Sequence, residues 1–131
     1  MKRIIIAILA VFGCWAALDF VIHGLILAST YAATPQLWRP MPEMKMGLMY
    51  FTVLVTAAVF VYIYARFITD KGIKNAVLYG LIFGIGSGIS MGYGTYSVMP
   101  IPYAMAFVWF AGGVVEFTVA GLVAGLIVKK E

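Results

Sequence analysis

Apolar residues occur along this chain in four long, nearly unbroken stretches, and polar or charged residues gather between them. The stretches cover residues 4–28, 47–66, 75–97 and 103–128. Each is close to the about 20 residues that an α-helix needs to cross the hydrocarbon of a bilayer. None shows the period-two alternation of a membrane barrel, and backbone groups in hydrocarbon must be bonded within the chain. The pattern therefore predicts four transmembrane helices.

The connections between the stretches are of unequal length. Residues 29–46 form the longest one, and its three prolines predict an ordered, extended segment because proline fixes its own φ and restricts its neighbour. The last connection, residues 98–102, is short and uncharged. We therefore expect an all-α protein, an integral membrane four-helix antiparallel bundle that forms a single domain over residues 1–131.

Composition supports a membrane protein and argues against several other classes. The chain is 64% hydrophobic and 11% charged, against roughly 45–50% and about 25% in a soluble domain. Too few residues lie outside the stretches to build a separate catalytic domain, so we expect no enzymatic activity. The basic residues stand at the ends of the stretches and form no patch with interleaved aromatics, so nucleic acid is not an expected partner and membrane lipids are.

The distribution of basic residues predicts the orientation of the chain. Seven of the nine lie at the two ends of the chain or around the second connection: Lys2, Arg3, Arg66, Lys71, Lys74, Lys129 and Lys130. Loops rich in lysine and arginine stay in the cytoplasm. Both termini are therefore predicted to be cytoplasmic (N-in/C-in), with residues 29–46 on the outer face. The single cysteine, Cys14, allows no intrachain disulfide.

Glycine recurs every four residues in the third stretch, at Gly80, Gly84, Gly88 and Gly92. Such a ridge lets another helix backbone approach closely, which is how helices associate where lipid supplies no hydrophobic drive. We favour packing within the chain. The alternative is that this helix forms the contact of a homodimer or of a larger membrane complex.

Three ionisable residues lie inside the stretches: Asp19, His23 and Glu116. Each costs about 2.5–3.5 kcal/mol on insertion scales, so such residues point to function by default. Counting along the helices places the two acids at similar depth, with His23 one turn beyond Asp19 on the same face. Trp15 shares the face of Asp19, and Trp109 shares the face of Glu116. Together they predict a ligand- or ion-binding site in the outer half of the bundle.

One more residue and one alternative interpretation bear on this site. Tyr93 is a candidate hydrogen-bond partner for the acids if it points inward, whereas most of the other tyrosines are typical of an aromatic belt. The alternative interpretation is structural: neutral acids that hydrogen-bond tyrosines or backbone and hold the helices in register.

Four methionines stand where the first connection enters the second stretch, at Met41, Met44, Met46 and Met49. Thioethers suit Cu(I), so His23 with Met46 and Met49 is a candidate metal site on the outer face. Methionine is also a flexible filler of apolar interfaces, and this explanation is the stronger one. Haem-attachment and phosphate-binding motifs are missing from the sequence, and no cofactor is expected apart from such a metal ion.

Several of these positions resemble an uncharacterised family of small four-helix proteins of the bacterial inner membrane, known as a domain of unknown function. The likeness lies in Asp19-Phe20, in the run Gly92-Tyr93-Gly94-Thr95-Tyr96, and in Trp109 followed by Glu116. The resemblance implies a multi-pass topology in the bacterial inner (cell) membrane and a polar pocket, and nothing about a substrate.

The sequence as a whole predicts a small integral membrane protein that binds or transports a small cationic or protonatable ligand, or a metal ion, through a pocket in the outer half of the bundle. The alternative is a non-enzymatic accessory or assembly subunit of a larger membrane complex. In that case the glycine-rich helix packs against the partner and the acids are structural.

Overall fold

The computed structural model describes residues 1–129, which form helices and their connections without a β-strand. Four helical segments are long and apolar enough to cross a membrane: Lys2–Ile26, Met46–Phe67, Ile73–Val98 and Tyr103–Ile127. Their ends agree with the predicted stretches to within two residues. An all-helical chain with four such segments is therefore confirmed. Lys130, which contributed to the predicted orientation, lies outside the described residues.

Two of the four segments change their helical geometry part of the way along. In the first, α1 (Lys2–Asp19) continues into the π-helical η1 (Phe20–Ile26). In the third, α4 (Ile73–Ile89) continues into the π-helical η4 (Ser90–Gly94) and the short α5 (Thr95–Val98). Apolar periodicity near 3.6 residues does not reveal such wider turns, which are frequent at functional sites.

The longest connection is ordered, but the prediction that it is extended is wrong. It contains the short helix α2 (Ala28–Ala32) and the 3-10 turns η2 (Pro35–Leu37) and η3 (Met41–Glu43). Prolines stand in the first positions of both 3-10 turns, where the absent N–H would have no helical partner. Proline here begins helical turns instead of preventing them.

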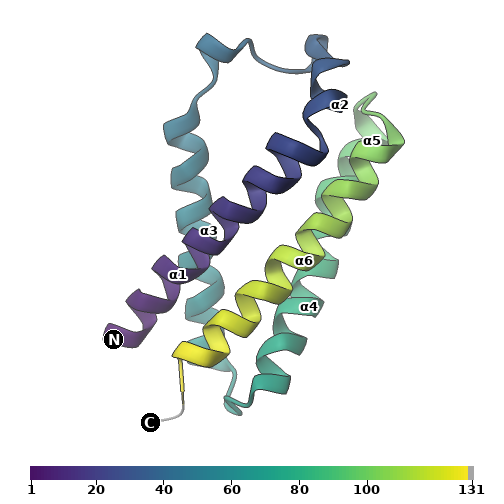
Figure 1. Ribbon diagram of the computed structural model, residues 1–131. Helices are drawn as coiled ribbons and strands as arrows, with labels where there is room; N and C mark the ends of the chain where they lie inside the picture. Colours follow the sequence, from purple (N-terminus) through teal and green to yellow (C-terminus); the bar gives the residue numbers. More distant parts are fainter. Residues whose placement is uncertain (130–131) are drawn as a thin grey trace.

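Figure 1 shows how the long segments are arranged. The first residues of α1 and the last residues of α6 (Tyr103–Ile127) lie at one end of the molecule, called here the terminal end. The short helices α2 and α5 lie at the other, called the loop end. Helices α4 and α6 run side by side, and α1 packs against both α6 and α3 (Met46–Phe67).

The glycine ridge of α4 and η4 forms the contact with α6. Gly80, Gly84, Gly88 and Gly92 are all buried. A Cβ atom on Gly80 would lie 2.1 Å from the carbonyl oxygen of Phe117, a distance that no real atom pair tolerates. The four glycines therefore let the backbones of α4 and α6 touch within one chain, and α6 covers this face.

A different kind of contact keeps α3 apart from α4. The ring of Phe60 on α3 stacks on Tyr79, with centroids 4.6 Å apart, and meets Phe83 edge-on at 5.4 Å. Trp15 and Phe117 pack against the same ring from α1 and α6. These five residues, the aromatic cluster, fill the space between α3 and α4 on the terminal side of the molecule. Side chains, not backbones, set the separation of these two helices.

We expect Gly80→Ala to destabilise the fold by about 1–3 kcal/mol or more, because its methyl group would overlap the backbone of α6. Thermal unfolding of the purified protein in detergent measures this effect. Gly86→Ala is the matched control, because nothing lies within 4 Å of a Cβ at that position of the same helix. Equal stability of the two variants would contradict the backbone contact between α4 and α6.

Candidate functional site

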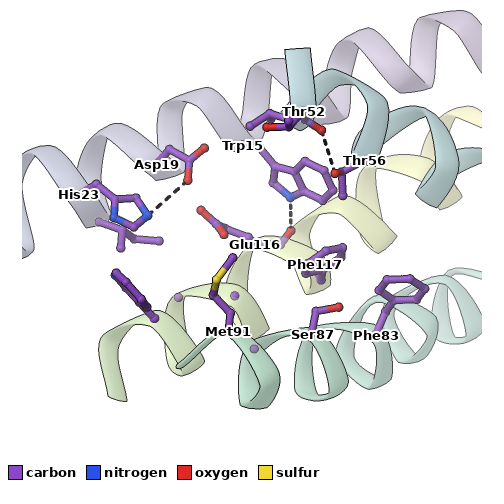
Figure 2. A pocket seen from close by; sticks show the side chains of 16 residues that line it. Trp15, Asp19, His23, Thr52, Thr56, Phe83, Ser87, Met91, Glu116 and Phe117 are labelled. Carbon is purple, nitrogen blue, oxygen red and sulfur yellow. Dashed lines mark hydrogen bonds and ion pairs between the residues drawn. The ribbon is translucent and has the colours of Figure 1, made fainter. Parts of the chain in front are cut away.

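A cavity of about 560 Å³ lies among the four long segments, on the loop side of the aromatic cluster (Figure 2). Its lining comes from α1, η1, α3, α4, η4 and α6. The aromatic cluster forms its floor, since Trp15, Phe83 and Phe117 line it. Volumes of this order are typical of small-molecule sites.

The cavity exists because the residues beyond the aromatic cluster are too small to bridge the helices. On α3 the lining residues next along the chain are Thr52, Val53 and Thr56, and on α4 they are Ser87 and Gly88. The aromatic rings fix the distance between α3 and α4, and these shorter side chains cannot fill it. Space is left where the rings end.

Two carboxyl groups face each other inside this cavity. Asp19 comes from the end of α1 and Glu116 from the middle of α6, and their side chains point toward one another (Figure 2). The Oε1 atom of Glu116 is buried and has no hydrogen-bond partner. Two negative charges so close together in a low dielectric repel each other, and a proton or a cation between them relieves that repulsion.

A hydrogen-bonded chain joins Trp109, Tyr31 and His23 beside Asp19. Trp109 donates its indole N–H to the hydroxyl of Tyr31 at 2.9 Å, and that hydroxyl lies 2.6 Å from Nδ1 of His23. Nε2 of His23 lies 3.7 Å from Oδ1 of Asp19, a longer contact of ion-pair type. Burial raises the pKa of Tyr31, the neighbouring Asp19 adds to this, and the Trp109 hydrogen bond opposes it. The phenol therefore keeps its proton.

The Tyr31 hydroxyl is a shared partner of Trp109 and His23. An indole N–H can only donate, so the hydroxyl accepts from Trp109, and its second lone pair and its own proton remain for Nδ1 of His23. Trp109 and Tyr31 together hold the His23 ring with Nε2 on the side of Asp19. Of the two neighbours of the ring, Tyr31 lies closer to it than Asp19 does.

Trp15 fixes the position of Glu116. Its indole N–H donates to the backbone carbonyl of Glu116 at 2.8 Å, and its ring packs edge-on against Phe117 with centroids 5.0 Å apart. The Trp15 side chain is almost fully buried. It therefore joins α1 to α6 one turn from Asp19 and holds both acids at the same level.

The structure brings together five of the residues that the sequence proposed for the ligand site. Asp19, His23, Glu116, Trp15 and Trp109 all line the cavity. Their helical faces had been identified from spacing alone. What spacing did not contain is the pairing of α1 with α6, which gives the five residues a common space.

Tyr93 and the two methionines lie elsewhere. The hydroxyl of Tyr93 bonds to that of Tyr103 at 2.9 Å, and Tyr93 does not line the cavity. Met46 and Met49 are exposed in the first turn of α3 and do not line it either. Within residues 1–129, no three His, Cys, Asp or Glu side chains are grouped as metal ligands.

Several residues in or beside the cavity were not identified from the sequence. Tyr31 reads as a member of an aromatic belt, yet it carries the link between Trp109 and His23. Thr52 and Thr56 read as ordinary polar residues of an apolar helix, yet they form one wall of the cavity. No sequence signal distinguishes them, because which face of α3 turns inward depends on the helices that it meets.

We expect Tyr31→Phe to lower the free energy of unfolding by about 1–3 kcal/mol, because it leaves the indole N–H of Trp109 without an acceptor. Thermal unfolding in detergent is again the measurement. Tyr50→Phe is the control: Tyr50 is 48% exposed, and removal of its hydroxyl should change stability little. If both variants unfold like the wild type, the hydrogen-bonded chain does not support the fold.

A comparison of this chain with models of protein families, with curated proteins and with solved structures found no match. The likeness to a family of small inner-membrane proteins rests on the residues quoted for it and stays a prediction. A proposal for function therefore draws on the geometry of the cavity and on the chemistry of its lining.

Proposed function

We propose that this protein is a multi-pass membrane protein that binds, or carries across the membrane, a small cationic or protonatable ligand in the cavity beside Asp19 and Glu116. The observation that carries the proposal is the buried, unpartnered Oε1 atom of Glu116, which stands next to a second carboxyl group in a cavity of about 560 Å³. A buried acceptor without a donor costs about 1–3 kcal/mol, and more when charged. A cationic donor removes that cost and offsets the repulsion of the two acids.

We propose an antiparallel bundle with both termini in the cytoplasm, so that the loop end faces outward. The excess of lysine and arginine at the chain ends and around the α3–α4 connection supports this orientation. The resemblance to small inner-membrane proteins supports a bacterial inner membrane as its location.

The alternative of an accessory subunit has less support. It relies on the glycine ridge of α4 as a surface for a partner, and α6 of the same chain covers that ridge. An accessory role would need a different face. It would also leave the unpartnered Glu116 oxygen and the cavity without an explanation.

The first test is ligand-induced stabilisation. We expect at least one member of a panel of amines and of Zn²⁺, Mn²⁺ and Cu(I) to raise the unfolding temperature in a saturable way, since a ligand at 100 times its Kd contributes about 2.7 kcal/mol. Glu116→Gln and Asp19→Asn should abolish the effect. Glu43→Gln, the same change in the connection outside the cavity, should keep it. If no member of the panel stabilises the wild type, the proposal is wrong.

The orientation has its own test. In a Cys14→Ser background, we expect Gln36→Cys to react with a membrane-impermeant maleimide on intact cells. Thr69→Cys, in the connection at the terminal end, should react only after the cells are permeabilised. Both positions are exposed, so access to the reagent depends on the side of the membrane. The reverse labelling pattern would invert the proposed topology.

A further inference from the structure

The walls of the cavity differ in how far they are covered. On the α1 and η1 side, Trp15 and Ile22 are 5% and 7% exposed, and only His23, nearer the loop end, is exposed. On the opposite side Thr52, Thr56 and Met91 are all exposed, although they line the same cavity. The longer uncovered edge therefore lies between the loop half of α3 and the α4–η4 segment. We call it the lateral opening.

The lateral opening lies on the side of the bundle, not at its end. Residues 46–56 of α3 are exposed, apart from the half-buried Val53. The surrounding surface is made of apolar side chains such as Phe51, Val55 and Ile89. In a membrane such a surface contacts hydrocarbon, so the cavity opens toward lipid.

The hydroxyl groups at the rim of the lateral opening are already hydrogen-bonded within the protein and do not need water. The hydroxyl of Thr52 donates to the carbonyl oxygen of Met49 at 2.7 Å, and that of Thr56 donates to the carbonyl oxygen of Thr52 at 2.8 Å. Polar groups bonded to their own helix in this way are tolerated beside lipid. An apolar molecule can therefore cross the rim without stripping water from an unpaired group.

The acids lie deep inside the span. Glu116 is 13 residues from the start of α6 at Tyr103 and 11 from its end at Ile127, which places it about 17–20 Å from either end at about 1.5 Å per residue. A lipid headgroup held at the membrane surface does not reach this depth. The charged group that meets Glu116 must belong to a molecule that enters the bundle.

The lining also favours an organic ligand over a metal ion. A metal site holds its ion with several ligands in a compact shell, and the residues described here offer no such group. The cavity is far larger than an ion, and the rings of Trp109, Phe83 and Phe117 line it. Aromatic faces bind apolar bodies and attract ammonium groups.

This inference rests on the proposed function and names its ligand class. We propose that the ligand is a lipophilic amine that enters from the membrane through the lateral opening. Its protonated nitrogen lies between Asp19 and Glu116, and its apolar body packs against Trp109, Phe83 and Phe117. The nitrogen carries at least one hydrogen, because the unpartnered Oε1 atom of Glu116 requires a donor and a quaternary ammonium has none.

The ligand class is tested with four probes on the purified wild-type protein, read out as the concentration that gives half of the maximal rise in unfolding temperature. Phenylbutylamine carries both the charge and the apolar body. Methylamine carries only the charge, phenylbutanol carries only the body, and Zn²⁺ stands for a metal ion. We expect phenylbutylamine to act at a concentration at least about tenfold below methylamine, since burial of a phenyl group adds well over 1.4 kcal/mol. We expect no effect from phenylbutanol or Zn²⁺, nor from phenylbutylamine on Glu116→Gln.

The lateral opening is tested by narrowing it. Thr52→Phe places a ring in the rim, and we expect phenylbutylamine to bind at least about tenfold more slowly than to the wild type, followed through tryptophan fluorescence, because the ring narrows the path of entry. Val55→Phe is the matched control on the same helix, since Val55 is 44% exposed and does not line the cavity. Its rate of binding should equal that of the wild type.

The outcomes separate this inference from the proposed function. If methylamine or Zn²⁺ stabilises the wild type and depends on Glu116 while phenylbutylamine does not, a cation site exists but the ligand class is wrong. If no cation acts, both proposals fail. An unchanged rate of binding to Thr52→Phe overturns the lateral opening. Should Thr52→Phe not fold, Thr56→Phe, at the other threonine of the rim, takes its place in this test.

Discussion

The backbone contact between α4 and α6 is the constraint on which the rest of the structure depends. Glycine every fourth residue lets these helices touch without side chains between them, as in Gly80 against the carbonyl oxygen of Phe117. Helix α3 has no such ridge and meets α4 through the rings of Phe60 and Tyr79. Helices α4 and α6 are therefore close together, whereas α3 and α4 are held apart. This asymmetry produces the cavity where the rings end.

The polar groups of the cavity are positioned by contacts outside it. Trp15 ties the backbone of Glu116 to α1, and Trp109 reaches through Tyr31 to His23 and so toward Asp19. The connection at the loop end is thus hydrogen-bonded to His23 and Trp109, which stand beside the acids. Rigid support of this kind keeps an unpartnered carboxylate oxygen in place, because a side chain free to turn would find water or a backbone donor.

Much of the site was predictable because ionisable residues are rare in apolar helices. Asp19, His23 and Glu116 are conspicuous because an ionisable side chain raises the free energy of membrane insertion. Counting along the helices then placed the two acids at similar depth. Tyr93 lies outside the cavity, since its hydroxyl bonds to that of Tyr103. Met46 and Met49 lie on an exposed turn for a similar reason: closeness in sequence to the loop end does not bring a side chain to the cavity.

The sequence by itself determined the four apolar helices, their lengths and the acids within them, because insertion cost and helix length act on each segment separately. Only the tertiary structure decided which faces meet. Whether the glycine ridge faces α6 or another chain, whether Tyr31 lies in a belt or bonds to His23, and where α3 leaves a gap all depend on contacts between segments far apart in sequence. Those contacts are set by the shapes of two surfaces together, and no single segment contains that information.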